Sequence, residues 1–241
     1  MYHLPLTLET PAENLALDEA LLEAAVTGEL PGEVLRVWEP AEYFVVLGRS
    51  SAAAEVRLDA CTADGLPVLR RPSGGATVAA GPGCLMYALV LDLDRVAELR
   101  HVDRAHQFVL GRMAAALASV VPGVAVFGTS DLAIPASLNG SPPRKFSGNS
   151  LRLKRNRLLY HGTILYDFPL EQLERWLDRP ARQPEYRQAR RHAEFVTNLS
   201  VGRDDLTASL VNEWNATEVL TRWPRERTAE LAACRYSVLD W

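Results

Sequence analysis

A glycine-rich segment between two apolar runs most constrains how this chain can fold. Residues 70–83 read RRPSGGATVAAGPG. The runs before and after it, residues 66–69 and 84–91, have the length and the branched or aromatic residues of β-strands. Because glycine tolerates positive φ and leaves backbone N–H groups uncovered, Gly74 and Gly75 can let an anion approach the main chain. The segment is therefore predicted to be a loop between two strands.

Two arginines stand at the start of this loop. Arg70 and Arg71 carry guanidinium forks that match a carboxylate or a phosphate. This combination suits an anion that lies against the main chain. The alternative is a hairpin with glycines in its turn and two solvated arginines, and the segment alone favours neither interpretation.

Composition narrows the classes of protein to consider. The 241 residues are 48% hydrophobic and 23% charged, which is typical of a soluble globular protein with a sizeable core. The net charge of −4 argues against a nucleic-acid binder, which needs a basic surface. No run approaches the ~20 apolar residues of a membrane span, and the acidic N-terminal stretch is unlike a signal peptide. We therefore expect a cytoplasmic protein that binds neither nucleic acid nor membrane.

Apolar periodicity predicts both helices and strands. Helical spacing occurs at residues 14–26, 52–63, 102–121, 170–177, 187–195, 206–214 and 225–233. Strand patterns occur at residues 34–38, 43–47, 66–69, 84–91, 124–134, 145–153 and 158–167. Because the strands come in runs, we predict an α+β fold with a mainly antiparallel sheet flanked by helices. A doubly wound α/β fold is the alternative, but its phosphate-binding glycine motifs are missing.

No repeat or linker divides the chain, so residues 1–241 are expected to form a single domain. The most loop-like run is residues 135–144, which is a candidate lid over a site. Near it, lysine is conspicuous because only two of the 26 basic residues are lysines, Lys145 and Lys154. Lys145 opens the run KFSGNS, where a bend at Gly148 would let an ammonium lie beside a bound anion. A surface lysine beside a tight turn is the alternative, and the rarity of lysine disfavours it.

Two further positions are candidates for ligand binding. His161, Gly162 and Thr163 interrupt an apolar strand, where glycine often marks the close approach of a ligand. A structural histidine is the alternative, and His106 among others is interpreted that way. Asp131, at the exit of a predicted strand, could hold Mg²⁺ or a ribose hydroxyl, or could simply stabilise a turn.

A catalytic nucleophile is not evident. The sequence has no G-x-S-x-G elbow, and neither Ser73 nor Ser147 has a histidine and an acid in the expected order. The three cysteines form no metal or disulfide pattern, and Cys84 is expected to pack inside a strand. These residues indicate a site that binds and polarises anions without a covalent intermediate.

Taken together, these residues resemble the biotin/lipoate protein ligase family, specifically the catalytic domain of lipoate-protein ligases. The matching segments are residues 14–22 (NLALDEALL), 45–49 (VVLGR), 70–78 (RRPSGGATV), 128–132 (GTSDL), 145–150 (KFSGNS), 161–163 (HGT) and 235–241 (RYSVLDW). Their colinear order is far more specific than any one of them.

The resemblance implies the α+β fold of biotin ligases and class II aminoacyl-tRNA synthetases. It also implies a two-step reaction, in which lipoate or octanoate attacks the α-phosphate of ATP with Mg²⁺ to give an acyl-adenylate. A lysine of an acceptor (lipoyl) domain then attacks the acyl carbon. Because adenylation activates the leaving group, such a reaction needs no enzyme nucleophile.

The resemblance further assigns roles to individual residues. Lys145 would be the catalytic residue, between the acyl carbonyl and the phosphate. The ATP contacts would be Arg71, Gly74, Gly75, Ala76, Thr77, Val78, Ala79, Asp131 and Lys145, with Asp131 also the metal candidate. The acyl substrate would meet Arg71, Ser73, Gly74, Gly148, His161, Gly162 and Thr163.

The chain departs from the family pattern in a few places. Ala76 replaces a third loop glycine, and Ala80 and Gly81 replace a His-Asp pair. Larger ligases continue past the position of Trp241 into an accessory domain. Either a separate accessory-domain protein supplies that role, or the chain performs part of the reaction, or it uses another acyl substrate.

Two other functions stay open. Octanoyl or lipoyl transferases of the same fold act without ATP through an acyl-cysteine, but residues 124–182 around Lys145 contain no cysteine. A non-catalytic acyl or nucleotide binder is the other alternative. Arg152, Lys154, Arg155 and Arg157 could dock an acidic acceptor domain, although a solvated hairpin tip is the simpler interpretation.

Overall fold

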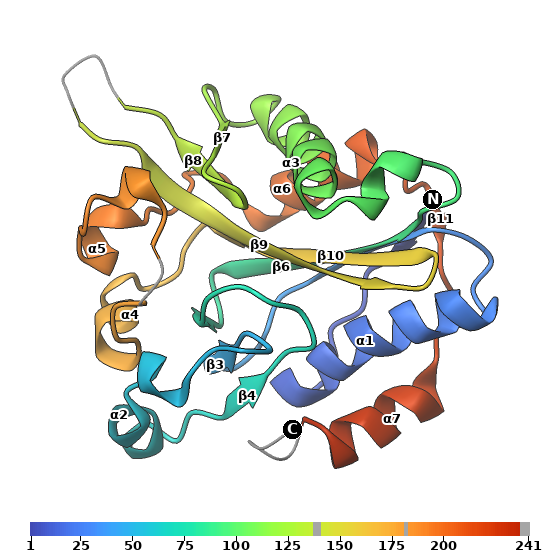
Figure 1. Ribbon diagram of the computed structural model, residues 1–241, viewed down its shortest axis with the longest axis horizontal. Coiled ribbons are helices and arrows are strands. Elements are labelled where there is room, and N and C mark those ends of the chain that lie inside the picture. Colours follow the sequence, from blue (N-terminus) through green and yellow to red (C-terminus); the bar gives the residue numbers. More distant parts are fainter. Residues whose placement is uncertain (137–140, 181–182, 237–241) are drawn as a thin grey trace.

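The computed structural model describes residues 1–136, 141–180 and 183–236, and Figure 1 shows its arrangement. Residues 137–140 of the predicted lid lie outside the described residues. The larger sheet has eight strands in the order β11-β1-β2-β6-β10-β9-β8-β7. The bounds of these strands are β1 Tyr2–Leu4, β2 Val34–Trp38, β6 Cys84–Asp92, β7 Ala125–Phe127, β8 Asp131–Ile134, β9 Arg144–Lys154, β10 Arg157–Leu165 and β11 Glu218–Val219. Among the described strands of this sheet, β1 pairs in parallel with β2 and β11 and all other pairs are antiparallel, so the prediction of a mainly antiparallel sheet is confirmed.

A smaller sheet of three strands has the order β4-β3-β5. Its strands are β3 Phe44–Leu47, β4 Val68–Arg70 and β5 Val78–Ala80. The two apolar runs that flank the glycine segment therefore belong to different sheets, since β4 is in the small sheet and β6 in the large one. The segment crosses from one sheet to the other and contributes β5 on the way, so it is not a simple hairpin.

Helices cover both faces of the large sheet (Figure 1). The helices are α1 Pro11–Thr27, α2 Leu58–Ala63, α3 Val102–Ala118, α4 Glu171–Trp176, α5 His192–Phe195, α6 Arg203–Glu213 and α7 Arg225–Cys234, and the short 3-10 turns are η1 Ala53–Glu55, η2 Ala97–Arg100 and η3 Glu185–Arg187. Leu89 and Leu91 of β6 pack in the cluster that contains α3 and α6, whereas Ala88 and Val90 pack against α1. Because both faces are covered, β6 reads as a continuous apolar run instead of an alternating one.

Helix α1 begins three residues before its predicted start, because Thr10 and Glu13 form a capping box. It ends at Gly28, whose φ of 83° is left-handed. Its apolar spacing predicts an amphipathic helix with one solvent-exposed face. In the structure α1 instead lies between the large sheet and α7 and is buried almost all round. Asp18 and Glu19 are 3% and 1% exposed, and each is paired inside the protein.

Three predicted elements are divided in the structure. The helix expected at 52–63 is η1 and α2, separated where Val56 is extended and bridges to Leu177. The strand expected at 124–134 is the hairpin β7–β8, which turns near Gly128 at φ 55°. The helix expected at 187–195 is η3 and α5, interrupted by left-handed residues at Gln188 and Ala189. No helix among the described residues is long and apolar enough to cross a membrane.

Candidate functional site

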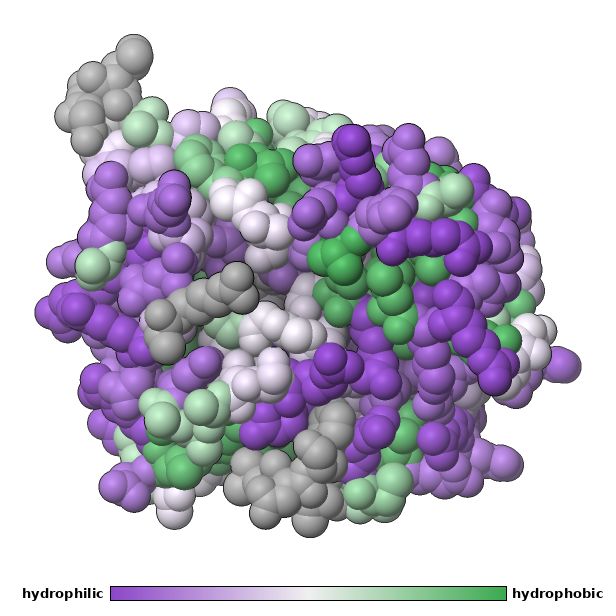
Figure 2. Space-filling model, viewed as in Figure 1, coloured by the Kyte–Doolittle hydropathy of each residue, from purple (hydrophilic) through white to green (hydrophobic). Residues whose placement is uncertain are grey.

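A pocket of about 660 Å³ lies where the glycine loop faces strands β8, β9 and β10. Its lining also includes residues of α1, α3 and β6 and the segment around Pro180 and Pro184. Elsewhere on the face shown in Figure 2, hydrophilic side chains dominate and hydrophobic ones form separate groups. Among the sequence-predicted site residues, the pocket is lined by Arg71, Gly75, Ala76, Val78, Asp131, Lys145, Gly148, His161, Gly162 and Thr163. Ser73, Gly74, Thr77 and Ala79 lie outside the lining.

Lys145 reaches this pocket from the start of β9. Its Nζ lies 2.7 Å from Oδ1 of Asp131, and its side chain is 25% exposed while that of Asp131 is 8% exposed. A Cβ on Gly148 would lie 2.8 Å from this Nζ, closer than real Cβ contacts come. The close approach expected at Gly148 is thus made by the lysine side chain, which passes over the glycine to its carboxylate.

The second oxygen of Asp131 is also occupied. Tyr186 donates its phenol O–H to Oδ2 at 2.8 Å, so both carboxylate oxygens have partners. Within the described part of the chain, no group of three or more His, Cys, Asp or Glu residues could hold a metal ion. Lys145 and Tyr186 thus already occupy the two oxygens of Asp131, the metal candidate.

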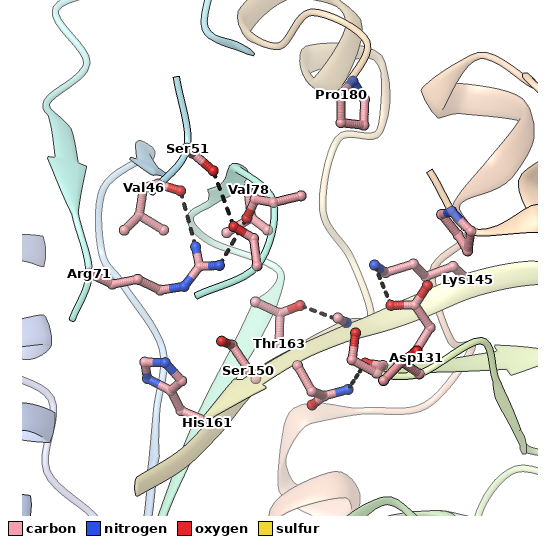
Figure 3. Close-up of a pocket in the computed structure, with 18 of the residues that line it drawn as sticks. Val46, Ser51, Arg71, Val78, Asp131, Lys145, Ser150, His161, Thr163 and Pro180 are labelled. Atoms are coloured by element: carbon pink, nitrogen blue, oxygen red, sulfur yellow. Dashed lines mark hydrogen bonds and ion pairs between the residues drawn. The ribbon is translucent and has the colours of Figure 1, made fainter. Parts of the chain in front are cut away.

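The guanidinium of Arg71 holds the glycine loop together. It donates to the carbonyls of Gly74 and Ala76 at 2.6 and 2.9 Å and to Oγ of Ser73 at 3.1 Å. Figure 3 shows its further bond to the carbonyl of Val46. Burial lowers the pKa of Arg71 to about 10, and the charge of Glu55 opposes that change. Arg70 similarly donates to the carbonyls of Gly48 and Ser51. Arg71 is buried and Arg70 is half-buried, and both donate to backbone carbonyls.

Glycine is required at one point of this loop and at one point of the turn after β3 that touches it. Gly75 has φ 87°, which is left-handed, whereas Gly74 does not use that conformation. A Cβ on Gly48 would lie 2.0 Å from the carbonyl oxygen of Gly75, so the backbones touch there. Ser150 of β9 donates to the carbonyl of Gly74 at 2.8 Å. The loop is therefore fastened to the same strand that carries Lys145.

His161 links the pocket to a buried polar chain. Its Nε2 lies 2.5 Å from Oγ of Ser73, and its Nδ1 lies 3.8 Å from Asp18, which pairs with the fully buried Arg36 at 2.6 Å. The order resembles a Ser-His-Asp triad, but Ser73 is 1% exposed and already accepts from Arg71. Ser73 therefore orients the loop and is not placed to attack a substrate.

Several pocket residues carry no signal in the sequence, among them Asn149 and His106. Asn149 accepts from the hydroxyl of Tyr87 at 2.5 Å and donates to the carbonyl of Ser130, and a Cβ on Gly162 would lie 1.9 Å from its Oδ1. The glycine in the HGT strand thus makes room for this amide. His106, interpreted as structural, lines the pocket from α3, and burial lowers its pKa. No local pattern marks either residue, because their partners come from distant strands.

The thiols and the basic hairpin lie apart from this chemistry. Cys61, Cys84 and Cys234 are all described residues, and none lines the pocket. Burial raises the pKa of Cys84 to about 12, so the packing interpretation is confirmed. On the β9–β10 hairpin, Arg152 donates to the carbonyl of Pro72, Lys154 pairs with Glu23, and Arg157 pairs with Asp92.

Figure 3 places Arg71 and Lys145 on opposite walls of the pocket, with Ser150 and Thr163 between them. An anion in this space would meet loop backbone on one side and an ammonium on the other. Val46, Val78, Met86 and Leu15 add apolar surface to the lining. The arrangement can therefore hold a molecule that carries both an anionic group and an apolar chain.

Comparison with known proteins agrees with this site. Residues 10–217 match the family described as the lipoyl protein ligase A/B catalytic domain. A probable lipoate-protein ligase A from Mycoplasma pneumoniae is 29% identical over 168 residues, which cover 70% of this chain and 46% of that protein. The chain spans about half the length of the first curated relatives that it matches.

Solved structures share the fold. A bipartite lipoate protein ligase from Thermoplasma acidophilum, described with its E2 lipoyl domain, superposes with a TM-score of 0.80 at 21% identity, over 100% of this chain and 94% of that one. A putative lipoate protein ligase from the same organism with bound lipoic acid gives 0.77 at 20% identity, over 100% and 97%. A lipoate-protein ligase A bound with ATP gives 0.74 at 20% identity, also over 100% and 97%. With the family match extending over most of its length and the fold in agreement, this chain belongs to the lipoyl protein ligase A/B catalytic domain family.

Proposed function

We propose that this protein is a lipoate-protein ligase that joins lipoate or octanoate to ATP as an acyl-adenylate and then transfers the acyl group to a lysine of a lipoyl acceptor domain. The proposal depends on one observation: the partly buried ammonium of Lys145 and the glycine loop line the same pocket. Related ligases with lipoic acid or ATP bound have the same fold, which supports this choice.

In this proposal the residues of the chain bind, orient and polarise. Gly75, Ala76 and Val78 of the loop, together with Arg71, would form the nucleotide wall. Lys145 lies opposite, where it would stabilise the negative charge that builds up on the phosphate during adenylation. The same ammonium offsets charge on the acyl oxygen when the acceptor amine attacks. Leu15, Val46 and Met86 would contact the acyl chain, and His161, Gly162 and Thr163 complete that wall.

The absence of a usable thiol supports a ligase over a transferase. A transferase of this fold would need a cysteine in contact with the acyl group, and all three cysteines of the chain lie away from the pocket. The mixed anhydride of an adenylate supplies its own leaving group. No enzyme nucleophile is needed for the proposed reaction.

The metal and the partners follow from the same proposal. Since Lys145 and Tyr186 already occupy the oxygens of Asp131, Mg²⁺ would enter as the counterion of the nucleotide. The Thermoplasma acidophilum neighbour is described as bipartite and studied with an E2 lipoyl domain. By analogy, we propose a lipoyl domain as acceptor and a separate accessory-domain protein as partner, in the cytoplasm.

Two assays on the purified protein test the proposed function. ATP–pyrophosphate exchange that depends on lipoate, measured with and without the accessory protein, is expected to be present. Acyl transfer from an acyl carrier protein without ATP is expected to be absent. Transfer without exchange would instead establish a transferase, and the absence of both activities would indicate a non-catalytic binder.

A further inference from the structure

Tyr186 makes a contact that the proposed reaction does not yet use. It lies in η3, close to Pro184 of the pocket wall, and donates its O–H to Oδ2 of Asp131 at 2.8 Å. The other oxygen of the same carboxylate holds Lys145 at 2.7 Å. One carboxylate therefore joins the phenol to the ammonium, and its two oxygens have different partners.

The position of this phenol is fixed by aromatic packing. The ring of Tyr186 lies between those of Phe127 and Phe195, with centroid distances of 5.1 Å to each. These contacts hold the ring from both sides, and so place its hydroxyl, without involving the hydroxyl group itself.

The phenol also keeps its proton. Burial raises the pKa of Tyr186 far above its ordinary value, and the nearby charge of Asp131 raises it further. At neutral pH it therefore remains a hydrogen-bond donor to the carboxylate. Neutral donors that face a charged acceptor form stronger hydrogen bonds than neutral pairs.

We propose that Tyr186 is a positioning residue that places the Lys145 ammonium by fixing the plane of the Asp131 carboxylate. The inference rests on the proposed function and adds a residue to it. With Oδ2 held by the phenol, Oδ1 can face only the lysine. Without the hydroxyl, the carboxylate can turn about its Cβ–Cγ bond, where the rotational preference is broad. The partly exposed ammonium would then lose its fixed place opposite the loop.

Tyr186→Phe removes the hydroxyl and keeps the ring between its two aromatic neighbours. The kcat of lipoate-dependent pyrophosphate exchange is expected to fall about tenfold, the effect of losing one hydrogen bond to a charged group. The KM values for ATP and lipoate are expected to change less than about twofold, because Tyr186 does not line the pocket. An unchanged kcat, or a loss confined to KM, would overturn the proposal.

Tyr166→Phe is the matched control. Its hydroxyl donates to both oxygens of Glu39, at 2.8 and 2.9 Å, and Tyr166 does not line the pocket. This variant also loses a phenol hydroxyl that donates to a carboxylate. Its kcat is expected to match that of the unmodified protein.

A double-mutant cycle tests whether the effect passes through the carboxylate. In an Asp131→Ala background, Tyr186→Phe is expected to cause little further loss of kcat, because no side-chain oxygen remains to link the phenol to Lys145. Losses that multiply independently would show that Tyr186 acts by another route.

The two lysines allow a test that does not require activity. Protein labelled with ¹³C at lysine Cε should give two side-chain resonances, which Lys154→Arg assigns. Tyr186→Phe is expected to shift the Lys145 resonance and to leave the Lys154 resonance unchanged. Lys154 lies at the other end of β9 and pairs with Glu23. An unmoved Lys145 resonance contradicts the positioning role. Absence of exchange in the unmodified protein contradicts the proposed function instead.

Discussion

At the scale of single residues, Lys145 combines a charge with a shape. An arginine there would keep the charge, but its planar fork is larger than an ammonium and cannot pass as closely over Gly148. We expect Lys145→Arg to lower pyrophosphate exchange by at least about 100-fold, the scale of losing one preorganised donor, with little change in Tm. Exchange rates and thermal unfolding of the purified variant measure both effects.

Lys154→Arg provides the comparison for this substitution. Lys154 pairs with Glu23 outside the pocket, so its replacement is expected to leave exchange unchanged. Full activity in Lys145→Arg would show that the ammonium has no special role.

The site residues that were predicted are marked by residues close to them in the sequence, whereas those that were missed interact with distant ones. Lys145 and Gly148 are three positions apart, His161 and Gly162 are adjacent, and all four line the pocket. Tyr186 meets an aspartate 55 positions away, and no spacing rule reaches that far. The role of Arg71 could not be predicted either. An arginine that holds its own loop and an arginine that binds a phosphate look the same in the sequence.

At the scale of elements, the start of α1 depends on its capping box. Oγ1 of Thr10 accepts from the backbone N–H of Glu13 at 3.2 Å, and the Glu13 carboxylate accepts from the N–H of Thr10. Thr10→Ala is expected to lower the free energy of unfolding by about 1 kcal/mol. Urea denaturation followed by circular dichroism measures this loss.

Thr207→Ala is the control for the cap. Its hydroxyl donates to the carbonyl of Arg203 within α6 and satisfies no unpaired helix N–H. Since alanine favours helix interiors, its effect on unfolding is expected to be smaller. Equal losses at positions 10 and 207 would argue against a capping contribution.

Elements were predicted well where apolar periodicity was long and poorly where tertiary contacts decide. The strands β6, β9 and β10 agree with their predicted ranges within one or two residues. The short strands β1, β5 and β11 were missed, because two or three residues carry no usable periodicity. The break at Val56 arises from its bridge to Leu177, which is remote in the sequence.

At the scale of the whole molecule, buried histidines make stability depend on pH. Burial and the charge of Arg187 lower the pKa of His192 from 6.5 to about 4. Between these values the unfolded chain binds a proton that the folded chain does not, so stability is full above pH 6.5 and falls as pH decreases towards 4. Burial lowers the pKa of His3 and His106 in the same direction.

The substitution His192→Gln removes one of these titrations. The urea midpoint of the unmodified protein is expected to drop between about pH 7.5 and about pH 5, and the drop is expected to be smaller in the variant. An identical pH dependence in both proteins would exclude His192 as a source of acid sensitivity.

Both lysines of the chain are held against carboxylates, Lys145 by Asp131 and Lys154 by Glu23. Acylating agents modify free amines, whereas a guanidinium stays protonated and does not compete for them. A catalyst of the proposed kind would therefore offer its own reactive intermediate hardly any amine on which to be consumed. The scarcity of lysine on its surface would limit acylation of the enzyme itself. The lysine of the acceptor domain would then be the preferred target.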